Sequence, residues 1–251
     1  MNFKDHFSAA AADYARYRPG YPEALPEFLA ETAPGRDCAW DCATGTGQAA
    51  VMLAPHFRRV IATDASAEQV ARARPCPGVT YRVAPAEAPE LPEGSADLIT
   101  VAQALHWLDH DRFYVQVRRV LRPGGVVAAW AYTLARVPDA AAAPVNEVIQ
   151  SFYEEMSPWW PPERAHVESG YRDLPFPFEP VAAPAFQMHA RWPMERLLGY
   201  FSTWSAVLRC RRDTGRNPLG PLAVRLETAW GEPSRPQDIR WPVALRIGRV
   251  A

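Results

Sequence analysis

Between residues 36 and 132, the spacing of apolar residues switches repeatedly between two patterns. Short apolar runs typical of strands take turns with stretches in which apolar residues recur every three or four positions, as Phe113, Val117 and Val120 do. This alternation predicts a parallel sheet with right-handed crossovers and helices on both faces. The expected strands span residues 37–42, 60–63, 79–83, 97–102 and 126–132, with helices over 47–56, over 66–74 capped by Ser66, and from residue 111.

The second half of the chain has a different pattern. Pro, Trp and Phe become dense in SPWWPPERAHVESGYRDLPFPFEP, which predicts packed loops and short helices. One amphipathic helix is predicted over residues 193–210 and another over 221–230. The alternating segment 185–190 is predicted to pair with a terminal strand over 239–250. This length suits one α/β domain with an elaboration, so we expect a single domain over residues 1–251.

The segment WDCATGTGQAA holds a glycine loop directly after the first predicted strand. Gly45, Gly47 and Ala50 fit the dinucleotide-binding pattern G-x-G-x-x-G/A. Asp64 follows 19 residues after Gly45, near the spacing of a ribose-binding acid. Asp41 discriminates between cofactors. A carboxylate there would repel a pyrophosphate by about 4 kcal/mol at ~4 Å and an effective dielectric near 20, but would attract the ammonium and sulfonium of S-adenosylmethionine.

Ligands of open α/β sheets bind at the carboxyl ends of the parallel strands. In this chain those ends carry Asp41, Asp64, residues 84–87 and residues 103–106. We therefore expect the functional residues there. Asp97 begins its strand at the opposite edge of the sheet, so we expect it to be structural.

Composition and charge narrow the function further. A net charge of −1 gives no electrostatic support for binding nucleic acid or an anionic membrane. The N-terminus lacks the apolar core of a signal peptide, and no run approaches the ~18 apolar residues of a membrane span. We expect a soluble cytoplasmic protein, monomeric or homodimeric. Because no C-x-x-C pair occurs, buried reduced thiols and no metal site are expected for Cys38, Cys42, Cys76 and Cys210.

A family resemblance is carried by five segments in register: WDCATGTGQ, IATDAS, APAEAPELP, ADLITVAQALHWLD and VLRPGGVVAAW. In this order and spacing they resemble the successive motifs of class I S-adenosylmethionine-dependent methyltransferases. The resemblance extends to the trans-aconitate-methyltransferase-like branch through YARYRPGYP, LGYFSTWSAVLR and WPVALRIGR. The family implies a seven-stranded Rossmann-like sheet, mostly parallel, with an antiparallel last strand between the fifth and sixth. It also implies a helical lid over residues 1–35, a cofactor-binding core over 36–132 and a substrate-side elaboration over 133–251.

The resemblance assigns the cofactor, S-adenosyl-L-methionine, to residues of the matching motifs. Asp64 would hold the ribose hydroxyls, and Ala86 with Glu87 would flank the adenine amino group. Arg18 is a candidate for the cofactor carboxylate. The other implied cofactor positions are Tyr14, Asp41, Ala43, Gly45, Ala65 and Gln103.

Several of these residues also suit positions without a role in cofactor binding. Asp41 and Asp64 also suit turn-capping positions, Glu87 suits an exposed loop, and Arg18 suits a surface position next to a proline turn. Ala43 stands where the family usually has glycine. Alanine restricts φ there without forbidding the turn.

Methyl transfer from a sulfonium is an in-line displacement, so positioning the acceptor supplies much of the rate. A carboxylate acceptor is ionised at neutral pH, whereas a phenol, alcohol or amine benefits from a base. His106, at the end of the fourth strand, is the candidate base or substrate orienter, with a structural histidine as the competing interpretation. Aromatic residues that suit a water-excluding substrate pocket, or alternatively core packing, are Tyr21, Trp107, Trp159, Trp160 and Trp204.

Methyl transfer to a small-molecule acceptor, with S-adenosyl-L-homocysteine as product, is the function that the sequence favours. Carboxylate O-methylation ranks ahead of other O or N acceptors. The strand end AQALHW lacks the Asn/Asp-Pro-Pro-aromatic pattern of nucleic-acid amino methylation. Two alternatives remain. An NAD(P)-dependent oxidoreductase fits the glycine pattern but not Asp41, and a non-catalytic S-adenosylmethionine-binding protein would use the same pocket without turnover.

Overall fold

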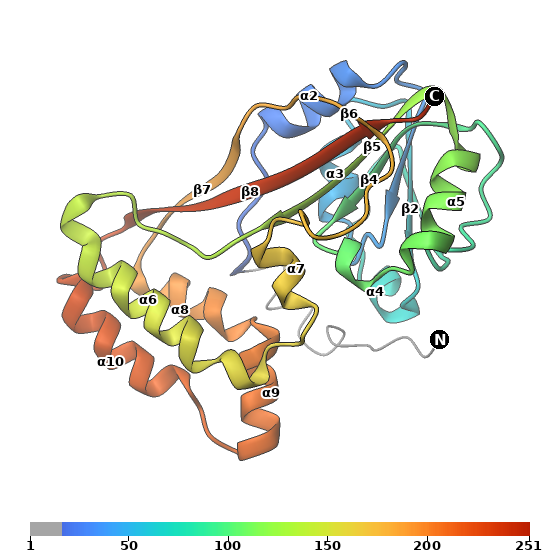
Figure 1. Ribbon diagram of the computed structural model, residues 1–251. Helices are drawn as coiled ribbons and strands as arrows, with labels where there is room; N and C mark the ends of the chain where they lie inside the picture. The colour runs from blue at the N-terminus through green and yellow to red at the C-terminus, as the bar shows by residue number, and fades with distance from the viewer. Residues whose placement is uncertain (1–16) are drawn as a thin grey trace.

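The computed structural model describes residues 17–251, and Figure 1 shows a twisted sheet with helices on both faces and a group of helices at one end. Tyr14 and much of the predicted lid over 1–35 lie outside the described residues. The strands are β1 Cys38–Cys42, β2 Arg59–Asp64, β3 Val79–Val83, β4 Ala96–Ala102, β5 Leu121–Tyr132, β6 Glu179–Pro180, β7 Phe186–Trp192 and β8 Gln237–Arg249. The α-helices are α2 Ala24–Thr32, α3 Gln48–Leu53, α4 Ala67–Ala71, α5 His110–Val120, α6 Ala143–Glu155, α7 Arg164–Glu168, α8 Met194–Ser202, α9 Ser205–Thr214 and α10 Leu219–Trp230. Short 3₁₀ helices are η2 Leu105–Trp107, η3 Ala140–Ala142 and η4 Ser157–Trp159.

The sheet confirms the predicted topology. Its strand order is β3-β2-β1-β4-β5-β8-β6, and β1 to β5 run parallel. The last strand, β8, runs antiparallel to β5, with residues 126–132 facing 243–249. β6 and β7 pair with opposite ends of the other edge of β8, so the eight strands occupy seven positions. The predicted pairing of residues 185–190 with the terminal strand is also confirmed.

Both faces of the sheet are buried because its central strands are apolar at almost every position. All five residues of β1 are buried. On one face Leu25 of α2 and Leu53 of α3 are fully buried, and on the other Phe113 and Val117 of α5 pack against the strands. This arrangement leaves the carboxyl ends of the strands as the place where loops meet.

Asp97 has the structural position that the sequence predicts. Its fully buried carboxylate accepts the backbone N–H groups of Asp37 and Cys38 through Oδ2, both at 2.9 Å. Its Oδ1 lies 2.8 Å from Nη1 of Arg122. The side chain therefore joins the start of β4 to the start of β1, at the edge opposite the strand ends that face the cavity described below.

Caps fix two helices that follow strands. Ser66 accepts the backbone N–H of Gln69 at 3.2 Å and begins α4 as predicted, although α4 ends at Ala71, short of residue 74. Asp109 caps α5 by accepting the N–H of Arg112.

A group of helices, α6, α8, α9 and α10, gathers beside β7 and the first half of β8 (Figure 1). Its apolar core includes Ile149, Phe152, Phe201 and Leu226, each at most 1 % exposed. The Pro- and Trp-rich segment forms η4, α7 and packed loops, as predicted. Within residues 17–251 no helix is long and apolar enough to cross a membrane.

The second half also differs from the prediction in several places. The single helix expected over residues 193–210 is two helices, because the backbone turns out of α8 at Thr203 and is extended at Trp204 (ψ 133°). Thr203 Oγ1 donates to the carbonyl of Tyr200, and the Trp204 ring is buried against Phe152, so both side chains hold the break. The pattern did not predict α6, and Cys76 is only partly buried.

Candidate active site

A cavity of about 780 Å³ lies at the carboxyl ends of β1 to β4. Ligand pockets commonly have volumes of about 300–1,000 Å³. One part of the lining, the loop wall, consists of residues within 43–49, 64–69, 84–88 and 102–104, at the carboxyl ends of the strands and in the segments that follow them. A second part, the aromatic wall, comprises Arg18, Tyr21, His106, Trp107, Tyr132, Trp160, Arg164, Tyr200 and Trp204.

The glycine loop after β1 turns tightly against β2. Thr44 N–H donates to the carbonyl of Thr63 at 2.9 Å, and Gly47 N–H donates to the carbonyl of Thr44 at 3.0 Å. Gly47 has φ +87°, and a Cβ there would overlap the phenol ring of Tyr81. Glycine is therefore needed at this position for two independent reasons.

Ala43 adopts the left-handed backbone conformation that the family's usual glycine would adopt freely. Its φ is +54°, a region that costs an L-residue about 1–2 kcal/mol. Its side chain lines the cavity. The turn thus forms with alanine, and the added methyl group becomes part of the loop wall.

Asp41 lies beneath the loop and is not among the residues that line the cavity. The carboxylate is fully buried, and it accepts hydrogen bonds from the hydroxyls of Thr44 and, at 2.7 Å, Thr100. Burial raises the pKa of Asp41 to about 6, against the opposing effect of these hydroxyls. Any effect of its charge on a ligand therefore acts through the loop and not by direct contact.

Two carboxylates do reach the loop wall. Asp64 is held by the backbone N–H groups of Gly45 and Ser66, which donate to its two oxygens at 2.8 Å each. Glu87 Oε1 accepts the N–H of Asp109 at 3.1 Å. The structure brings both to one cavity, together with the predicted positions Ala65, Ala86 and Gly45.

Gln103 is strained and has an unused donor. Its φ is +60°, and its backbone N–H donates to the carbonyl of Trp130 at 2.8 Å. The side chain lines the cavity, yet its buried Nε2 has no hydrogen-bond partner within the part of the chain that the structure describes. A buried donor without a partner is costly, so a ligand acceptor in the cavity would stabilise it.

Arg18 lies on the aromatic wall, between the sheet and α8. Its Nε donates to Thr203 Oγ1 at 3.0 Å, and Nη1 donates to the hydroxyl of Tyr132. Its guanidinium also lies 5.0 Å from the ring centroid of Tyr200. Arg18 lines the cavity, and these contacts fix the direction of its guanidinium.

Of the aromatic residues that the sequence offers for a substrate pocket, Tyr21, Trp107, Trp160 and Trp204 line the cavity, and Trp159 does not. Trp159 ends η4, and Trp160 is the next residue. The sequence alone does not tell which of these two adjacent tryptophans lines the cavity.

Arg164 brings positive charge to the same wall. Its guanidinium lies 4.8 Å from the ring centroid of Trp160, and Nε donates to the hydroxyl of Tyr153 at 3.3 Å. No ion pair joins Arg164 to a carboxylate within residues 17–251.

His106 lines the cavity from η2. Its Nδ1 lies 3.0 Å from the hydroxyl of Tyr171. Burial, together with the positive charges of Arg164, His166 and His110, lowers the pKa of His106 to about 3. The ring is therefore neutral near pH 7 and a poor proton acceptor.

Some cavity residues were not found from the sequence. Tyr132 ends β5, so the strand-end rule that selected Gln103 would have selected it as well. Arg164 and Tyr200 belong to α7 and α8, whose placement depends on tertiary packing and leaves no local signal. Within residues 17–251 no group of three or more His, Cys, Asp or Glu side chains could hold a metal ion.

Proteins similar to this chain are assigned as methyltransferases. A methyltransferase domain family matches residues 40–129. A Dictyostelium discoideum protein assigned as a methyltransferase is 34% identical over 253 residues, covering 98% of this chain and 95% of that protein. A solved structure from Anaeromyxobacter dehalogenans, assigned as a type II methyltransferase, has 49% identity and a TM-score of 0.85, covering 93% of this chain and 98% of that one.

A further relative is described by the cofactor that it uses. It is a Saccharomyces cerevisiae protein assigned as an S-adenosylmethionine-dependent methyltransferase, 30% identical over 131 residues, which are 49% of this chain and 45% of that protein. These relatives do not favour the oxidoreductase or a non-catalytic binding protein. The fold, the loop wall and the relatives agree, and this chain belongs to the class I S-adenosylmethionine-dependent methyltransferases.

Proposed function

We propose that this methyltransferase transfers the methyl group of S-adenosylmethionine to a carboxylate oxygen of a small-molecule acceptor, as the trans-aconitate-methyltransferase-like resemblance implies. One observation carries the proposal. The aromatic wall presents the guanidinium of Arg164 beside the neutral ring of His106. An arginine next to aromatic rings attracts an anion, and a poorly basic histidine suits an acceptor that has no proton to lose.

The residues of the loop wall fit the cofactor. The two carboxylates suit the ribose hydroxyls (Asp64) and the adenine amino group (Glu87), and Ala65 and Ala86 leave room for a flat base between them. The unpartnered Nε2 of Gln103 suits an oxygen of the bound cofactor or acceptor. Arg18 suits the cofactor carboxylate. When bound, S-adenosylmethionine supplies an electrophilic methyl group on a sulfonium.

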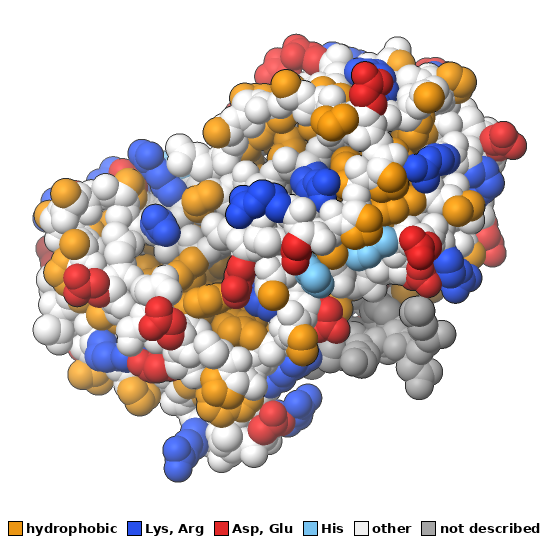
Figure 2. All heavy atoms as spheres, viewed as in Figure 1, with side chains coloured by type: hydrophobic (Ala, Val, Ile, Leu, Met, Phe, Trp, Pro, Cys, Tyr) orange, Lys and Arg blue, Asp and Glu red, His pale blue; other side chains and the backbone are white. Residues whose placement is uncertain are grey.

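The aromatic wall would then position the acceptor and exclude water. Tyr200 and Trp204 are at most 4 % exposed, so they form a fixed surface for the non-reacting part of the acceptor. Orientation of this kind is a large part of the rate enhancement in a displacement reaction. The face shown in Figure 2 carries acidic, basic and hydrophobic side chains interspersed, without a broad patch of one sign, which suits a small acceptor better than a nucleic acid.

Turnover on a matched acceptor panel tests the proposal. The panel contains carboxylic acids, phenols and amines of similar size, and S-adenosylhomocysteine release is measured together with the mass and saponification of the product. The expected result is methyl ester formation from carboxylic acids, at rates at least tenfold above those of the phenols and amines. Methylation of a phenol or amine without ester formation would contradict it.

Two variants test the proposed role of Arg164 in binding the acceptor carboxylate. Arg164→Gln should raise KM for the carboxylate acceptor by about tenfold to a hundredfold, since a charge-assisted hydrogen bond is worth about 1.5–3 kcal/mol. The dissociation constant for S-adenosylhomocysteine should stay within threefold. Arg216→Gln, at an exposed position outside the cavity lining, is the matched control and should change neither constant.

A further inference from the structure

Tyr171 is a buried tyrosine in a backbone conformation that tyrosine rarely adopts. It follows Gly170, and both residues have positive φ, +64° and +62°. The side chain is fully buried. A bulky residue held at positive φ is strained, and such strain persists only where the surroundings fix it.

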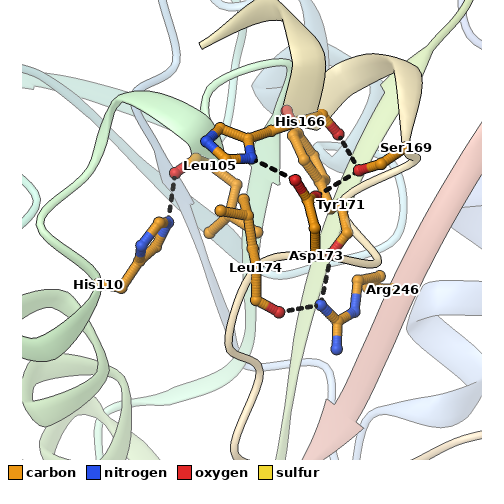
Figure 3. Close-up of polar contacts among 8 residues, drawn as sticks. All are labelled: Leu105, His110, His166, Ser169, Tyr171, Asp173, Leu174 and Arg246. Atoms are coloured by element: carbon orange, nitrogen blue, oxygen red, sulfur yellow. Dashed lines mark hydrogen bonds and ion pairs between the residues drawn. The ribbon is translucent and has the colours of Figure 1, made fainter.

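The surroundings fix the backbone of Tyr171 from two directions (Figure 3). Nη1 of Arg246, on β8, donates to the carbonyls of Tyr171 and Leu174. The N–H of Tyr171 donates to the carbonyl of His166, in α7, at 2.8 Å. Ser169 and His166 in turn contact the carboxylate of Asp173 and close the loop. This strained position brings the phenol to the ring of His106, which lines the cavity.

The phenol of Tyr171 has one hydrogen to donate and a clear acceptor for it. Nδ1 of His106 lies 3.0 Å from the phenol oxygen. Nδ1 is the only acceptor recorded for this hydroxyl among residues 17–251. If Nδ1 carried the proton instead, the buried phenol hydrogen would have no partner, which costs about 1–3 kcal/mol.

We infer that Tyr171 holds His106 as the tautomer protonated on Nε2, so that His106 donates an N–H hydrogen bond to the acceptor and does not act as a base. The inference rests on the proposed function for the identity of that acceptor. The edge of the ring that bears Nδ1 faces Tyr171, and Nε2 on the opposite side has no protein partner among the described residues. Tyr171 is a positioning residue in this account, because it acts on the acceptor only through His106.

The chemistry of the transfer agrees with a donor at this place. The bond between the methyl carbon and the sulfonium sulfur breaks, and a bond from that carbon to the carboxylate oxygen forms. The electron pair of the C–S bond stays on sulfur, the anion becomes a neutral ester, and no proton is released. A phenol or an ammonium group would have to lose a proton, and a histidine whose accessible nitrogen is already protonated cannot take it. The tautomer thus favours carboxylate acceptors over both.

The charged and titratable groups around the His106 ring disfavour its protonation to imidazolium. Arg164 and His166 approach from α7, and His110 approaches from α5, where its Nε2 contacts the carbonyl of Leu105 at 3.0 Å (Figure 3). With burial they lower the pKa of His106, so the imidazole stays neutral across the physiological range. A neutral imidazole ring carries one N–H, on either Nδ1 or Nε2, and the hydroxyl of Tyr171 decides which nitrogen carries it.

Nitrogen NMR of the unliganded protein tests the tautomer directly. In protein labelled with ¹⁵N-histidine, long-range ¹H–¹⁵N spectra separate the protonated from the unprotonated ring nitrogen, and the His106→Gln spectrum assigns the signals of His106. The expected result is a proton on Nε2 in the native protein and a mixture of tautomers in Tyr171→Phe. Tyr114→Phe removes another buried phenol, which donates to the carbonyl of Pro175, and should leave the His106 signals unchanged. A proton on Nδ1 in the native protein would overturn the inference.

Kinetics on the carboxylate acceptor tests the role of the N–H. Glutamine places an amide donor near the position of Nε2 but cannot accept a proton, so His106→Gln should keep kcat/KM within about tenfold of native. His106→Ala should lose tenfold to a hundredfold, the equivalent of a charge-assisted hydrogen bond. A loss in His106→Gln as large as that in His106→Ala would show that an amide donor does not replace the ring, and it would overturn the inference. If no carboxylic acid is methylated, the proposed function fails, while the NMR result still decides the tautomer.

Discussion

The two walls of the cavity differ in how the chain builds them. The residues of the loop wall lie at the carboxyl ends of parallel strands or in the short segments that follow them, so strand register largely sets their positions. The aromatic wall joins segments far apart in sequence: Arg18 contacts Thr203 across 185 positions, and His106 contacts Tyr171 across 65. The parallel sheet therefore fixes the positions of residues on the proposed cofactor side of the cavity, whereas the packing of the helical group fixes those on the proposed acceptor side. Substitutions should therefore separate the two walls.

Replacing Trp204 with alanine should have the largest effect, and it should fall on the aromatic wall. Trp204 is 4 % exposed, and its ring stacks on that of Phe152 with the centroids 5.7 Å apart and meets that of Phe201 edge-on at 4.7 Å. Loss of a buried tryptophan costs about 3–5 kcal/mol of unfolding free energy. Chemical denaturation should show that loss, and calorimetry on the folded protein should show an S-adenosylhomocysteine dissociation constant within threefold of native.

Trp159→Ala is the matched control for Trp204→Ala, because Trp159 is partly exposed and outside the cavity lining. We expect it to cost under about half as much stability. The distinction between a cofactor wall and an acceptor wall would be contradicted if Trp204→Ala weakened cofactor binding as strongly as acceptor binding.

Gly47→Ala should have the next largest effect, on the loop wall. The added methyl group meets the Tyr81 ring at a backbone φ of +87°, so overpacking and backbone strain add to about 2–4 kcal/mol. Thermal denaturation and S-adenosylhomocysteine titration should both show the loss. At Gly94, with φ +59° and open space around the Cβ position, alanine should cost only the backbone part, about 1 kcal/mol. Equal losses at Gly47 and Gly94 would show that the contact with Tyr81 has no role.

Asp41→Asn should separate stability from binding. Burial raises the pKa of Asp41 from 3.8 to about 6, so the folded state holds this proton more tightly than the unfolded chain does. The native protein therefore loses about 3 kcal/mol from this group as pH rises from below 4 to above 6. Asparagine does not titrate, so the variant lacks this pH-dependent loss. In urea titrations, its free energy of unfolding relative to that of the native protein should increase over the same pH range.

Cofactor binding should respond to Asp41→Asn in the opposite sense. The lost negative charge should weaken S-adenosylhomocysteine binding at pH 7.5 by at least tenfold, because the ligand ammonium is attracted through the loop. Thr100→Val, which removes one hydroxyl that donates to Asp41 but not the charge, is the control and should weaken binding less. An unchanged dissociation constant for Asp41→Asn would remove the charge argument.

Ala43→Gly should have the smallest effect. Glycine removes the cost of φ +54°, about 1 kcal/mol, but adds about 0.4–1 kcal/mol of entropy to the unfolded chain. The unfolding free energy should change by less than about 1 kcal/mol, and the S-adenosylhomocysteine dissociation constant by less than threefold. A larger gain in affinity would mean that the alanine methyl group obstructs the cofactor.

Local signals account for what the sequence could predict. Strand ends, glycines and caps are properties of a few adjacent residues, so Asp64, Glu87 and Gln103 were placed on one cavity and Asp97 was placed away from it. The burial of Asp41 beneath the loop was not predicted, because the sequence gives the strand end but not the depth of a side chain.

Tertiary packing decides what the sequence could not predict. The apolar period runs through the break at Thr203 and Trp204, so the pattern resembles one helix where packing makes two. Trp160, not Trp159, faces the cavity for the same reason. Tyr171 is 65 positions from the histidine it contacts, and nothing in its neighbourhood marks it.

A crystal structure with S-adenosylhomocysteine and a carboxylate acceptor tests most directly the claim that one cavity divides between a cofactor wall and an acceptor wall. We expect the adenine and ribose to lie against Glu87 and Asp64, and the acceptor carboxylate to lie between the thioether sulfur, Arg164 and Nε2 of His106. A sulfur atom directed away from the aromatic wall, or an acceptor bound without contact to Arg164 and His106, would contradict it.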